Sequence, residues 1–460
     1  MVAPFLDQAR CAARPGSGDR ADGHHSGSPG GGAGQDGRRI EPIQEPGKAT
    51  PPGGDEWRDK LIFGLLAVFI LGFYLLPSTR DLGSTPHDFL FYFGMLPAFV
   101  VLGASGLRRV IPPGDAGDRL LALALAFVLY LGVSALWTRG DRELSPLAVI
   151  LHTAATAVFM VGSSQVLNDR RWNQLRAMVV GAATAIAGAS LVGYLFGGSA
   201  RLGRLKSLIH FEHPNLFAHY VGFAALICLL RVLELRRSGG GRTARWAAAG
   251  LVLGGALVLT LGRSTMGVFV AAATLAVFVA RDRRVTAGLA LVLTMVVVGF
   301  LLVGGDWGPS FVYRGDAGRV FIYQNLLERM DGRWLVGVGL AASDDVQFPV
   351  GSPDFPRGFL MPHSHSAFVS TLYHGGLVGL ALLLVVVGSA GHRAWRIARE
   401  RGDPTGLVLL LFGVGCLLAD GHRLVSNPHL SSWLIFWLPV AWIISAERWV
   451  APREANAEVV

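Results

Sequence analysis

Long apolar stretches recur along this 460-residue chain and alternate with short polar segments. A helix needs roughly 20 mostly apolar residues to cross the hydrocarbon core of a bilayer. Stretches of that kind lie near residues 60–77, 89–103, 119–137, 146–162, 177–196, 214–233, 246–262, 265–280, 285–304, 364–389, 405–420 and 429–446. The pattern predicts an all-α polytopic membrane protein with about 12 transmembrane helices.

The composition agrees with a membrane location. Apolar residues make up 52% of the chain and charged residues 16%, whereas soluble domains are nearer one quarter charged. The mean hydropathy is positive. The formal net charge is +9, but the basic clusters fall in short loops between apolar stretches. We therefore attribute this charge to membrane topology and expect no nucleic acid as a partner.

Arginine clusters in the loops after the even-numbered stretches predict the orientation. These loops contain Arg108 and Arg109, Arg170 and Arg171, Arg236 and Arg237, Arg281, Arg283 and Arg284, and Arg393, Arg396, Arg399 and Arg401. The positive-inside rule puts these loops and both termini in the cytoplasm. The odd-numbered loops then face outward. The longest of them, 305–362 between spans 9 and 10, is expected to form a large extracytoplasmic loop.

The two ends of the chain differ from the apolar part between them. Residues 1–57 are rich in Gly, Pro, Ser and Arg and bury too little apolar surface to fold. We therefore expect a disordered cytoplasmic tail at 1–57, a transmembrane domain at 58–449 and a cytoplasmic tail at 450–460. The three cysteines lie far apart without C-x-x-C spacing, so they predict neither a disulfide framework nor a zinc site.

Two outward segments carry cations on the side where few are expected. The stretch RLGRLKSLIHFEHPNLFAHY contains Arg201, Arg204 and Asn215, and Arg263 occupies a very tight turn between spans 7 and 8. One interpretation is that the cations of the first segment reach lipid headgroups and that Arg263 only ties down the hairpin between spans 7 and 8. The other is that they bind an anion, because charged residues at span ends are often functional.

The stretch GRVFIYQNLLERM in the long loop predicts an amphipathic helix. Val320, Tyr323, Leu327 and Met330 recur at helical spacing, as on a helix that lies on the membrane or covers a cavity. Arg319 opens this helix. A helix N-terminus favours anions, and an arginine beside it offers a bidentate fork for a phosphate group.

The stretch MPHSHSAFV holds two histidines near the start of span 10. Pro362 marks the entry to the span, so His363 and His365 are expected in or near its first helical turn. A helix N-terminus disfavours imidazolium and leaves a histidine able to accept a proton. If both residues are helical, their rings lie on different faces.

A pair of interfacial, hydrogen-bonded histidines is the alternative at this position, and metal ligation is another. The chain shows no H-x-x-x-H spacing and no evident third ligand. The acidic turn at 343–345 fits a solvated turn better than a cation site. We therefore expect no metal.

The order of these stretches resembles one known family. RLGRLKSLIHFEHPNLFAHY, then LGRSTMG, then GRVFIY leading to LVGVGL, then HSHSAFVSTLYHGGLVGL is similar to the O-antigen ligase and O-antigen polymerase superfamily, over roughly residues 61–449. The resemblance implies a C-type glycosyltransferase fold in the bacterial plasma (inner) membrane, with the active site on the periplasmic face. It also implies a polyprenyl-diphosphate-linked glycan donor, an acceptor hydroxyl on a glycan, a lipid A core or a protein, and no cofactor or metal.

The resemblance implies roles for the arginines. Arg204, or Arg201, stands where the family has an arginine before its asparagine-containing stretch, and Arg263 matches an arginine that neighbours a serine. Arg319 matches the arginine of a G-R-x-x-x-W pattern, with Tyr323 in place of the tryptophan. All four arginines are expected to bind the donor diphosphate, Arg319 is also expected to act in catalysis, and Tyr323 should support it.

The resemblance also implies a catalytic histidine. His365 matches the second histidine of the family's H-x-H-N pattern, with Ser366 replacing the asparagine. His365 is therefore the expected catalytic base, with His363 and Asn215 in supporting roles.

These residue types suit transfer from a lipid diphosphate. The leaving diphosphate needs its negative charge stabilised, which fixed guanidinium groups do in a water-poor cavity. A sugar hydroxyl is a poor nucleophile until a base takes its proton. A ligase and a polymerase share this chemistry and differ in the acceptor. A transporter or flippase is a third alternative, but the spans show no convincing repeat of the kind typical of transporters.

Overall fold

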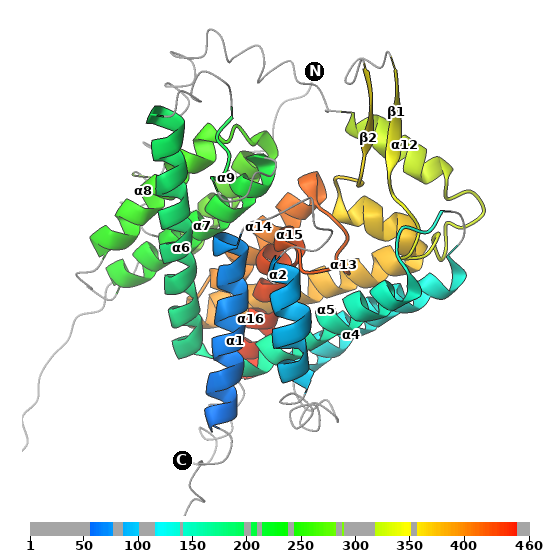
Figure 1. Ribbon diagram of the computed structural model, residues 1–460. Helices are drawn as coiled ribbons and strands as arrows, with labels where there is room; N and C mark the ends of the chain where they lie inside the picture. Colours follow the sequence, from blue (N-terminus) through cyan, green and yellow to red (C-terminus); the bar gives the residue numbers. More distant parts are fainter. Residues whose placement is uncertain are drawn as a thin grey trace, which may run out of the picture. The chain divides into compact units, whose positions relative to one another are not determined.

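The computed structural model describes residues 56–76, 86–100, 116–138, 141–196, 204–208, 214–237, 243–281, 288, 318–350 and 357–448, and this part of the chain is mostly helical (Figure 1). Its α-helices are α1 (Glu56–Leu75), α2 (Pro86–Phe89), α4 (Ala116–Ser134), α5 (Pro146–Val166), α6 (Asp169–Phe196), α7 (Pro214–Arg237), α8 (Thr243–Leu259), α9 (Arg263–Ala280), α12 (Arg319–Glu328), α13 (Ala367–Arg401), α14 (Thr405–Asp420), α15 (Leu430–Ser432) and α16 (Leu438–Arg448). Two π-helical segments, Leu90–Met95 and Trp433–Trp437, directly follow α2 and α15. The strands are β1 (Val346–Val350) and β2 (Arg357–Met361).

Helices coincide with eleven of the apolar stretches predicted to span the membrane. The twelfth, 285–304, lies outside the described residues except for Gly288, as do the predicted tails apart from Glu56 and Trp57. Six of the described helices are long and apolar enough to cross a bilayer, and three more are apolar but shorter. The helices support a polytopic membrane protein, while the number of spans and the side of each loop stay predictions.

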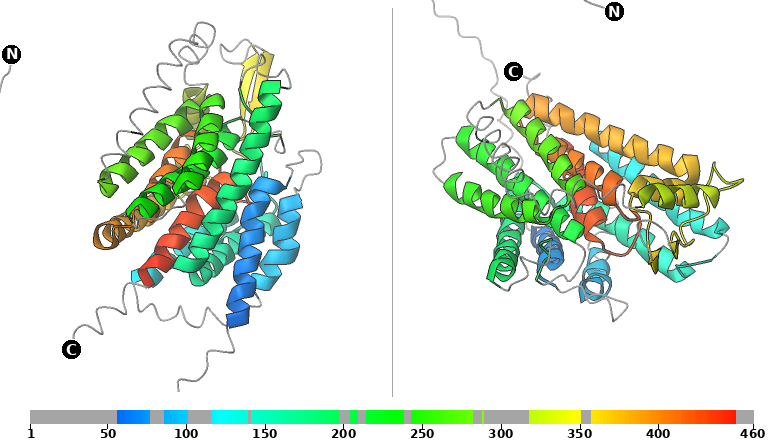
Figure 2. Two further views of the ribbon diagram at one scale, coloured as in Figure 1. Left: turned by 90° about the vertical axis from the view of Figure 1, so that its left-hand side faces the viewer. Right: turned by 90° about the horizontal axis from the view of Figure 1, so that it is seen from above.

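The C-terminal helices are enclosed by the others. Helix α14 packs against α7, α9 and α13, and α16 packs against α4, α5 and α13 (Figure 2). The indole ring of Trp433 is fully buried and packs edge-on against Phe69 and Phe91, at centroid separations of 5.5 and 4.9 Å. Such pairs contribute about 0.5–1.5 kcal/mol beyond burial. Since lipid tails are as apolar as these side chains, close packing holds the helices together.

Helix α13 is interrupted where the long loop joins it. Gly376 has φ 64° and ψ −164°, and a side chain there would collide with the backbone of Leu335, so this position needs glycine. The segment 334–339 runs along the break and pairs with it. The N–H of Gly339, for example, donates to the carbonyl of His374 at 2.9 Å. The long loop is thereby fastened to the helix that begins beside His365.

Helix α12 is confirmed as a helix, but only part of its predicted apolar face is buried. Met330 of that face is fully buried and Val320 is 55% exposed, whereas Ile322 and Leu326, which were not on it, are fully buried. The buried residues share an apolar cluster with Phe348 of β1, next to which α12 lies in Figure 1. The helix therefore turns its apolar side towards the hairpin, which the helical spacing alone did not indicate.

The β1–β2 hairpin departs from the all-α expectation. Its strands are antiparallel, with Val346 opposite Met361. Val346 and Phe348 are buried while Gln347 between them is exposed, which is the period-2 alternation of a half-buried strand. The hairpin ends at Met361, four residues before His365, and so connects the loop to the candidate site.

Candidate functional site

His365 lies directly before helix α13, near its first turn but outside it. Ser366 caps the helix, and its hydroxyl accepts a hydrogen bond from the N–H of Val369 at 3.4 Å. His365 has a left-handed backbone with φ 55°, which costs a non-glycine residue about 1–2 kcal/mol. Residues held in such conformations cluster at functional sites, so the backbone itself marks His365 as a candidate.

The ring of His365 is oriented by a carboxylate that the sequence analysis did not identify. Its Nδ1 lies 2.6 Å from Oδ1 of Asp420, the last residue of α14. A carboxylate accepts hydrogen bonds, so Nδ1 carries the proton and Nε2 of the neutral ring keeps its lone pair. A carboxylate in this position also stabilises the imidazolium that forms when Nε2 takes up a proton. The pair has the geometry of an oriented general base.

The other ring nitrogen of His365 faces a methionine. Nε2 lies 2.9 Å from Sδ of Met361, at the end of β2. A thioether is a weak acceptor on a flexible side chain, so this contact does not hold Nε2 as a strong hydrogen bond would. Nε2 is therefore the ring nitrogen that a stronger hydrogen-bond partner would compete for.

A chain of hydrogen bonds joins two predicted residues to this pair. The amide Nδ2 of Asn215 donates to Oδ2 of Asp420 at 2.6 Å. The guanidinium of Arg204 donates to Oδ1 of Asn215 and, through Nε, to the carbonyl of Thr260 at 2.6 Å. The structure therefore brings Arg204, Asn215 and His365 together around Asp420.

The remaining predicted arginines are connected less directly. Arg263 begins α9, three residues after Thr260, whose carbonyl binds Arg204, in the tight turn that was predicted. Arg319 begins α12 and is half-buried, and Tyr323 packs against the cluster that contains Met361. Arg201 lies outside the described residues. The donor-binding roles of these side chains stay predictions.

Asp420 was missed although the sequence carries a signal for it. It is a single carboxylate at the end of the apolar stretch 405–420, and charged residues at span ends are functional candidates. The same rule that pointed to the arginines therefore also applies to Asp420. The pairing itself is invisible in the sequence, because 55 residues separate Asp420 from His365.

Three further histidine rings extend from His365. Ring centroids are 4.0 Å apart for His363 and His365, 4.0 Å for His363 and His422, and 4.3 Å for His422 and His429. Because His363 and His365 are not helical, the expectation for helical residues does not apply, and their rings meet. Burial, together with neighbouring histidines, lowers the pKa of His363 to about 3 and holds the pKa of His422 well below its usual value.

The acidic turn at 343–345 is not a solvated turn, because Asp344 is only 2% exposed. Its Oδ1 accepts a hydrogen bond from Arg423 at 2.5 Å, and Arg423 also pairs with Glu143. Although burial pushes the pKa of Asp344 upward, the Arg423 guanidinium and His374 hold it well below its usual range. Burial alone would lower the pKa of Arg423, but the two carboxylates raise it. Three loops are thus tied together by one guanidinium.

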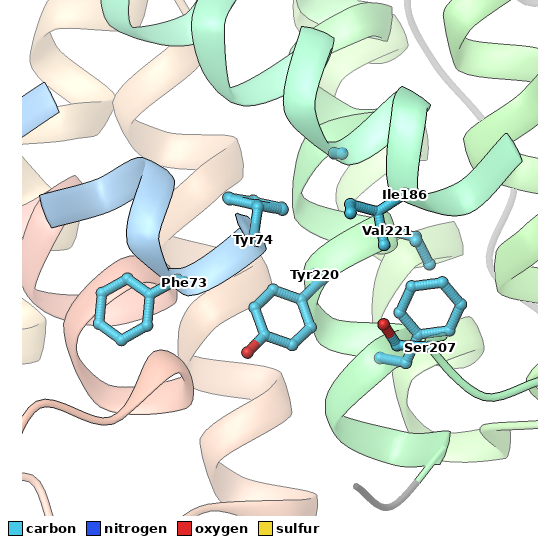
Figure 3. A pocket seen from close by; sticks show the side chains of 8 residues that line it. Phe73, Tyr74, Ile186, Ser207, Tyr220 and Val221 are labelled. Atoms are coloured by element: carbon cyan, nitrogen blue, oxygen red, sulfur yellow. The ribbon is translucent and has the colours of Figure 1, made fainter. Parts of the chain in front are cut away.

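A small apolar cavity of about 10 Å³ adjoins the segment that carries Arg204. The residues that line it include Phe73 and Tyr74 of α1, Ser207 of the segment 204–208 and Tyr220 of α7 (Figure 3). The rings of Tyr74 and Tyr220 lie 5.4 Å apart. A cavity of this size has room for about one water molecule. It shows that the side of the site next to 204–208 is apolar.

Within the described residues, no group of three or more His, Cys, Asp and Glu side chains is arranged to hold a metal ion. The site therefore consists of an oriented histidine, a buried carboxylate and a guanidinium joined to it through an amide. Its polar groups can accept a proton and stabilise negative charge. Metal independence of the reaction stays a prediction.

Comparison with known proteins adds an independent line of support. Residues 248–384 match the family model described as O-antigen ligase, a range that includes Arg263, Arg319 and His365. The O-antigen ligase of Pseudomonas aeruginosa is 24% identical over 345 residues, which cover 74% of this chain and 80% of that protein. The exopolysaccharide production protein ExoQ of Rhizobium meliloti is 28% identical over 311 residues, covering 61% of this chain and 67% of that protein.

Helices long and apolar enough to cross a membrane are found together with these similarities. The two relatives match 345 and 311 residues of this chain, and the family model matches residues 248–384. The comparisons confirm the predicted resemblance to the O-antigen ligase superfamily, and residues 248–384 match its O-antigen ligase model.

Proposed function

We propose that this protein is a membrane glycosyltransferase that passes a glycan from a polyprenyl-diphosphate-linked donor to an acceptor hydroxyl. The observation that carries the proposal is the 2.6 Å contact between His365 and Asp420. A histidine oriented by a buried carboxylate is suited to take a proton from a hydroxyl. The O-antigen ligase of Pseudomonas aeruginosa supports the same reaction class by its similarity.

In this reaction Nε2 of His365 takes the proton of the acceptor hydroxyl. The hydroxyl oxygen forms a bond to the anomeric carbon of the donor glycan as the bond from that carbon to the diphosphate breaks. The electron pair of the broken bond leaves with the lipid diphosphate. Asp420 stabilises the imidazolium, which returns its proton to solvent or to the departing diphosphate.

Arginine side chains stabilise the charge that builds up on the leaving group. Arg204 is fixed by two hydrogen bonds, to Asn215 and to the carbonyl of Thr260, so its guanidinium needs little reorganisation during the reaction. Arg263 begins α9, three residues after Thr260, the carbonyl partner of Arg204. Arg319, at the start of α12, adds a fork that matches a phosphate group.

The site faces the outer side of the bacterial plasma membrane in this proposal. The segments 204–208, 260–263, 361–365 and 420–423 all follow odd-numbered spans of the predicted topology, and both termini are cytoplasmic. Labelling with a membrane-impermeant maleimide tests this in a variant whose three native cysteines are replaced. Asn427→Cys should be labelled in intact cells and Arg401→Cys should not. The reverse pattern would place the chemistry on the wrong side.

A polymerase is the second candidate, favoured by the similarity to the exopolysaccharide production protein ExoQ. The two reactions differ in the acceptor, which is separate from the donor in a ligase and is another donor-linked chain in a polymerase. Purified protein given the lipid-linked donor alone distinguishes them. A ladder of longer lipid-linked glycans indicates a polymerase, whereas product formed only after a separate acceptor is added indicates a ligase. Donor consumed in neither case would contradict both and favour a transporter.

A further inference from the structure

A second, polar cavity of about 130 Å³ adjoins the candidate base. Its walls come from the loop before α5, the segment before α13 and the loop after α14. His363 lines it, and the ring of His363 is 4.0 Å from the ring of His365. A single water needs roughly 10–15 Å³ of such space, so the cavity holds a group larger than a few waters.

The cavity walls offer groups that hydrogen-bond to hydroxyls. The rings of His363, His422 and His429 follow one another along one wall, with interplanar angles of 48° and 49° between successive rings. Ser426 and Asn427 contribute a hydroxyl and an amide. The lowered pKa values of His363 and His422 keep these rings uncharged. A neutral imidazole carries one donor and one acceptor, and an amide carries both, which matches the hydroxyl groups of a sugar.

One buried atom of the wall lacks a hydrogen bond within the described part of the chain. It is Nδ1 of His152, a residue that lines the cavity. Buried polar atoms are normally satisfied by protein, water or ligand. A hydroxylated ligand in the cavity supplies a partner of the right kind.

The charge of the cavity argues against an anion. Arg423 is its one lining guanidinium, and it already pairs with Asp344 and Glu143. Two carboxylates therefore oppose one cation. A diphosphate or a sugar acid would meet net negative charge, which is unfavourable at such short range.

We propose that this cavity binds an uncharged terminal sugar of the acceptor and presents its hydroxyl to His365. The proposal rests on the transferase function above and adds the acceptor site and its preference for neutral sugars. A base must reach the hydroxyl that it deprotonates, and the cavity lies one histidine ring from the base. Arg204 of the proposed donor site lies on the Asn215 side of Asp420.

The first test fills the cavity. In proteoliposomes with purified lipid-linked donor, Ser426→Trp should raise the KM for the acceptor at least tenfold and leave the KM for the donor within twofold. Val350→Trp, on the 81% exposed end of β1, is the matched control and should change neither constant. Asn427→Ala, which removes an amide without adding bulk, should raise the acceptor KM severalfold. A rise confined to the donor KM, or unchanged constants in both cavity variants, would overturn the proposal.

The second test needs no reaction. Saturation-transfer NMR on the detergent-solubilised full chain, without donor, should detect a neutral hexose or N-acetylhexosamine and show at least tenfold weaker binding of a hexuronic acid. Ser426→Trp should abolish the signal. Equal or tighter binding of the uronic acid, or an unchanged signal in Ser426→Trp, contradicts the inference. Sugar binding in a protein that transfers nothing would instead refute the proposed function alone, while normal transfer by Ser426→Trp would refute the cavity alone.

Discussion

Two buried aspartates each lie beside a histidine, yet the two pairs are built differently. Oδ1 of Asp420 is 2.6 Å from Nδ1 of His365, whose side chain is 17% exposed. Asp344 lies 3.9 Å from Nε2 of His374, and that histidine side chain is 1% exposed. Asp344 forms an ion pair with the guanidinium of Arg423. Asp420 has instead the amide of Asn215 as a partner, and this amide in turn accepts from the guanidinium of Arg204.

The two histidines differ in whether a ring nitrogen stays accessible to accept a proton. His365 offers Nδ1–H to a carboxylate and keeps Nε2 behind a movable methionine. His374 has Nδ1 3.0 Å from the carbonyl of Gly339, and its other nitrogen is sealed beside Asp344. The same two residue types thus form a candidate base in one place and a loop clamp in the other. Access and tautomer, more than residue identity, separate the two roles.

The largest loss of stability should come from breaking the loop clamp, which consists of Asp344, Arg423 and His374. Arg423→Ala leaves Asp344 buried without its cation, and removing one partner of a buried ion pair costs about 3–5 kcal/mol. Thermal unfolding in nanodiscs should show a strong loss of stability. Arg231→Ala, which removes one side of an ion pair whose acid is 48% exposed, is the control and should cost less than about 1 kcal/mol.

Removing both charges sharpens the same point. Asp344→Asn combined with Arg423→Met leaves no isolated buried charge, so the double variant should recover much of the stability lost in Arg423→Ala. Similar losses in Arg423→Ala and Arg231→Ala would mean that the three loops are not held by this network.

Changing each aspartate to asparagine should affect a different property: transfer activity for Asp420 and thermal stability for Asp344. An amide at position 420 can turn its NH2 group towards His365, which moves the ring proton to Nε2 and removes the base. Asp420→Asn should therefore reduce transfer about 100-fold or more, equivalent to about 2.7 kcal/mol, with a near-normal melting temperature. Asp344→Asn should lower the melting temperature and leave transfer within a few-fold. Equal losses of transfer activity in the two variants would contradict the assignment of a catalytic role to Asp420 and a structural role to Asp344.

A smaller effect is expected on the free energy of unfolding below neutral pH, where His363 titrates in the unfolded chain. The pKa of His363 is about 3 in the folded protein, against about 6.5 for an unperturbed imidazole. Between these values the unfolded chain binds a proton that the folded chain does not, so stability falls as the pH drops from about 6.5 towards 3. The slope from His363 is at most about 1.4 kcal/mol per pH unit.

His363→Gln should flatten this slope, measured from unfolding in nanodiscs between pH 7.5 and 4.5. Asp344, with a lowered pKa, stabilises the fold above its usual value and loses that contribution only below about pH 4. Asp344→Asn should therefore leave the slope in this window unchanged. A wild-type stability that is constant or increases on acidification contradicts the assignment for His363.

The helices and part of the site could be predicted from the sequence. Apolar stretches of span length predict helices because each hydrogen-bonds its own backbone in a membrane. The cations in an outward segment pointed to Arg204, and the order of motifs pointed to His365. The contact of His365 with Asp420, and the link from Arg204 to Asp420 through Asn215, could not be predicted, since they depend on how α14 packs against α7 and α13.

Other features depend on loops meeting in space. Asp344 was expected to be solvated, because nothing near it in sequence shows that Arg423 covers it. The buried face of α12 is set by a hairpin whose short strands were not predicted, so the spacing that begins at Val320 indicated only part of that face. The need for glycine at position 376 could not be predicted either, because it arises from the segment 334–339 that runs beside Gly376 in space.

The role of His365 is tested most directly by transfer in proteoliposomes with purified lipid-linked donor, acceptor and a chelator present. His365→Ala should lower the initial rate about 10²–10⁴-fold, while donor binding and the melting temperature stay near the wild-type values because Arg204 remains in place. His374→Ala, the histidine of the clamp, should retain transfer in the fraction that folds. A His365→Ala rate within a few-fold of wild type, or a wild-type reaction stopped by the chelator, would contradict a metal-free mechanism with His365 as the base.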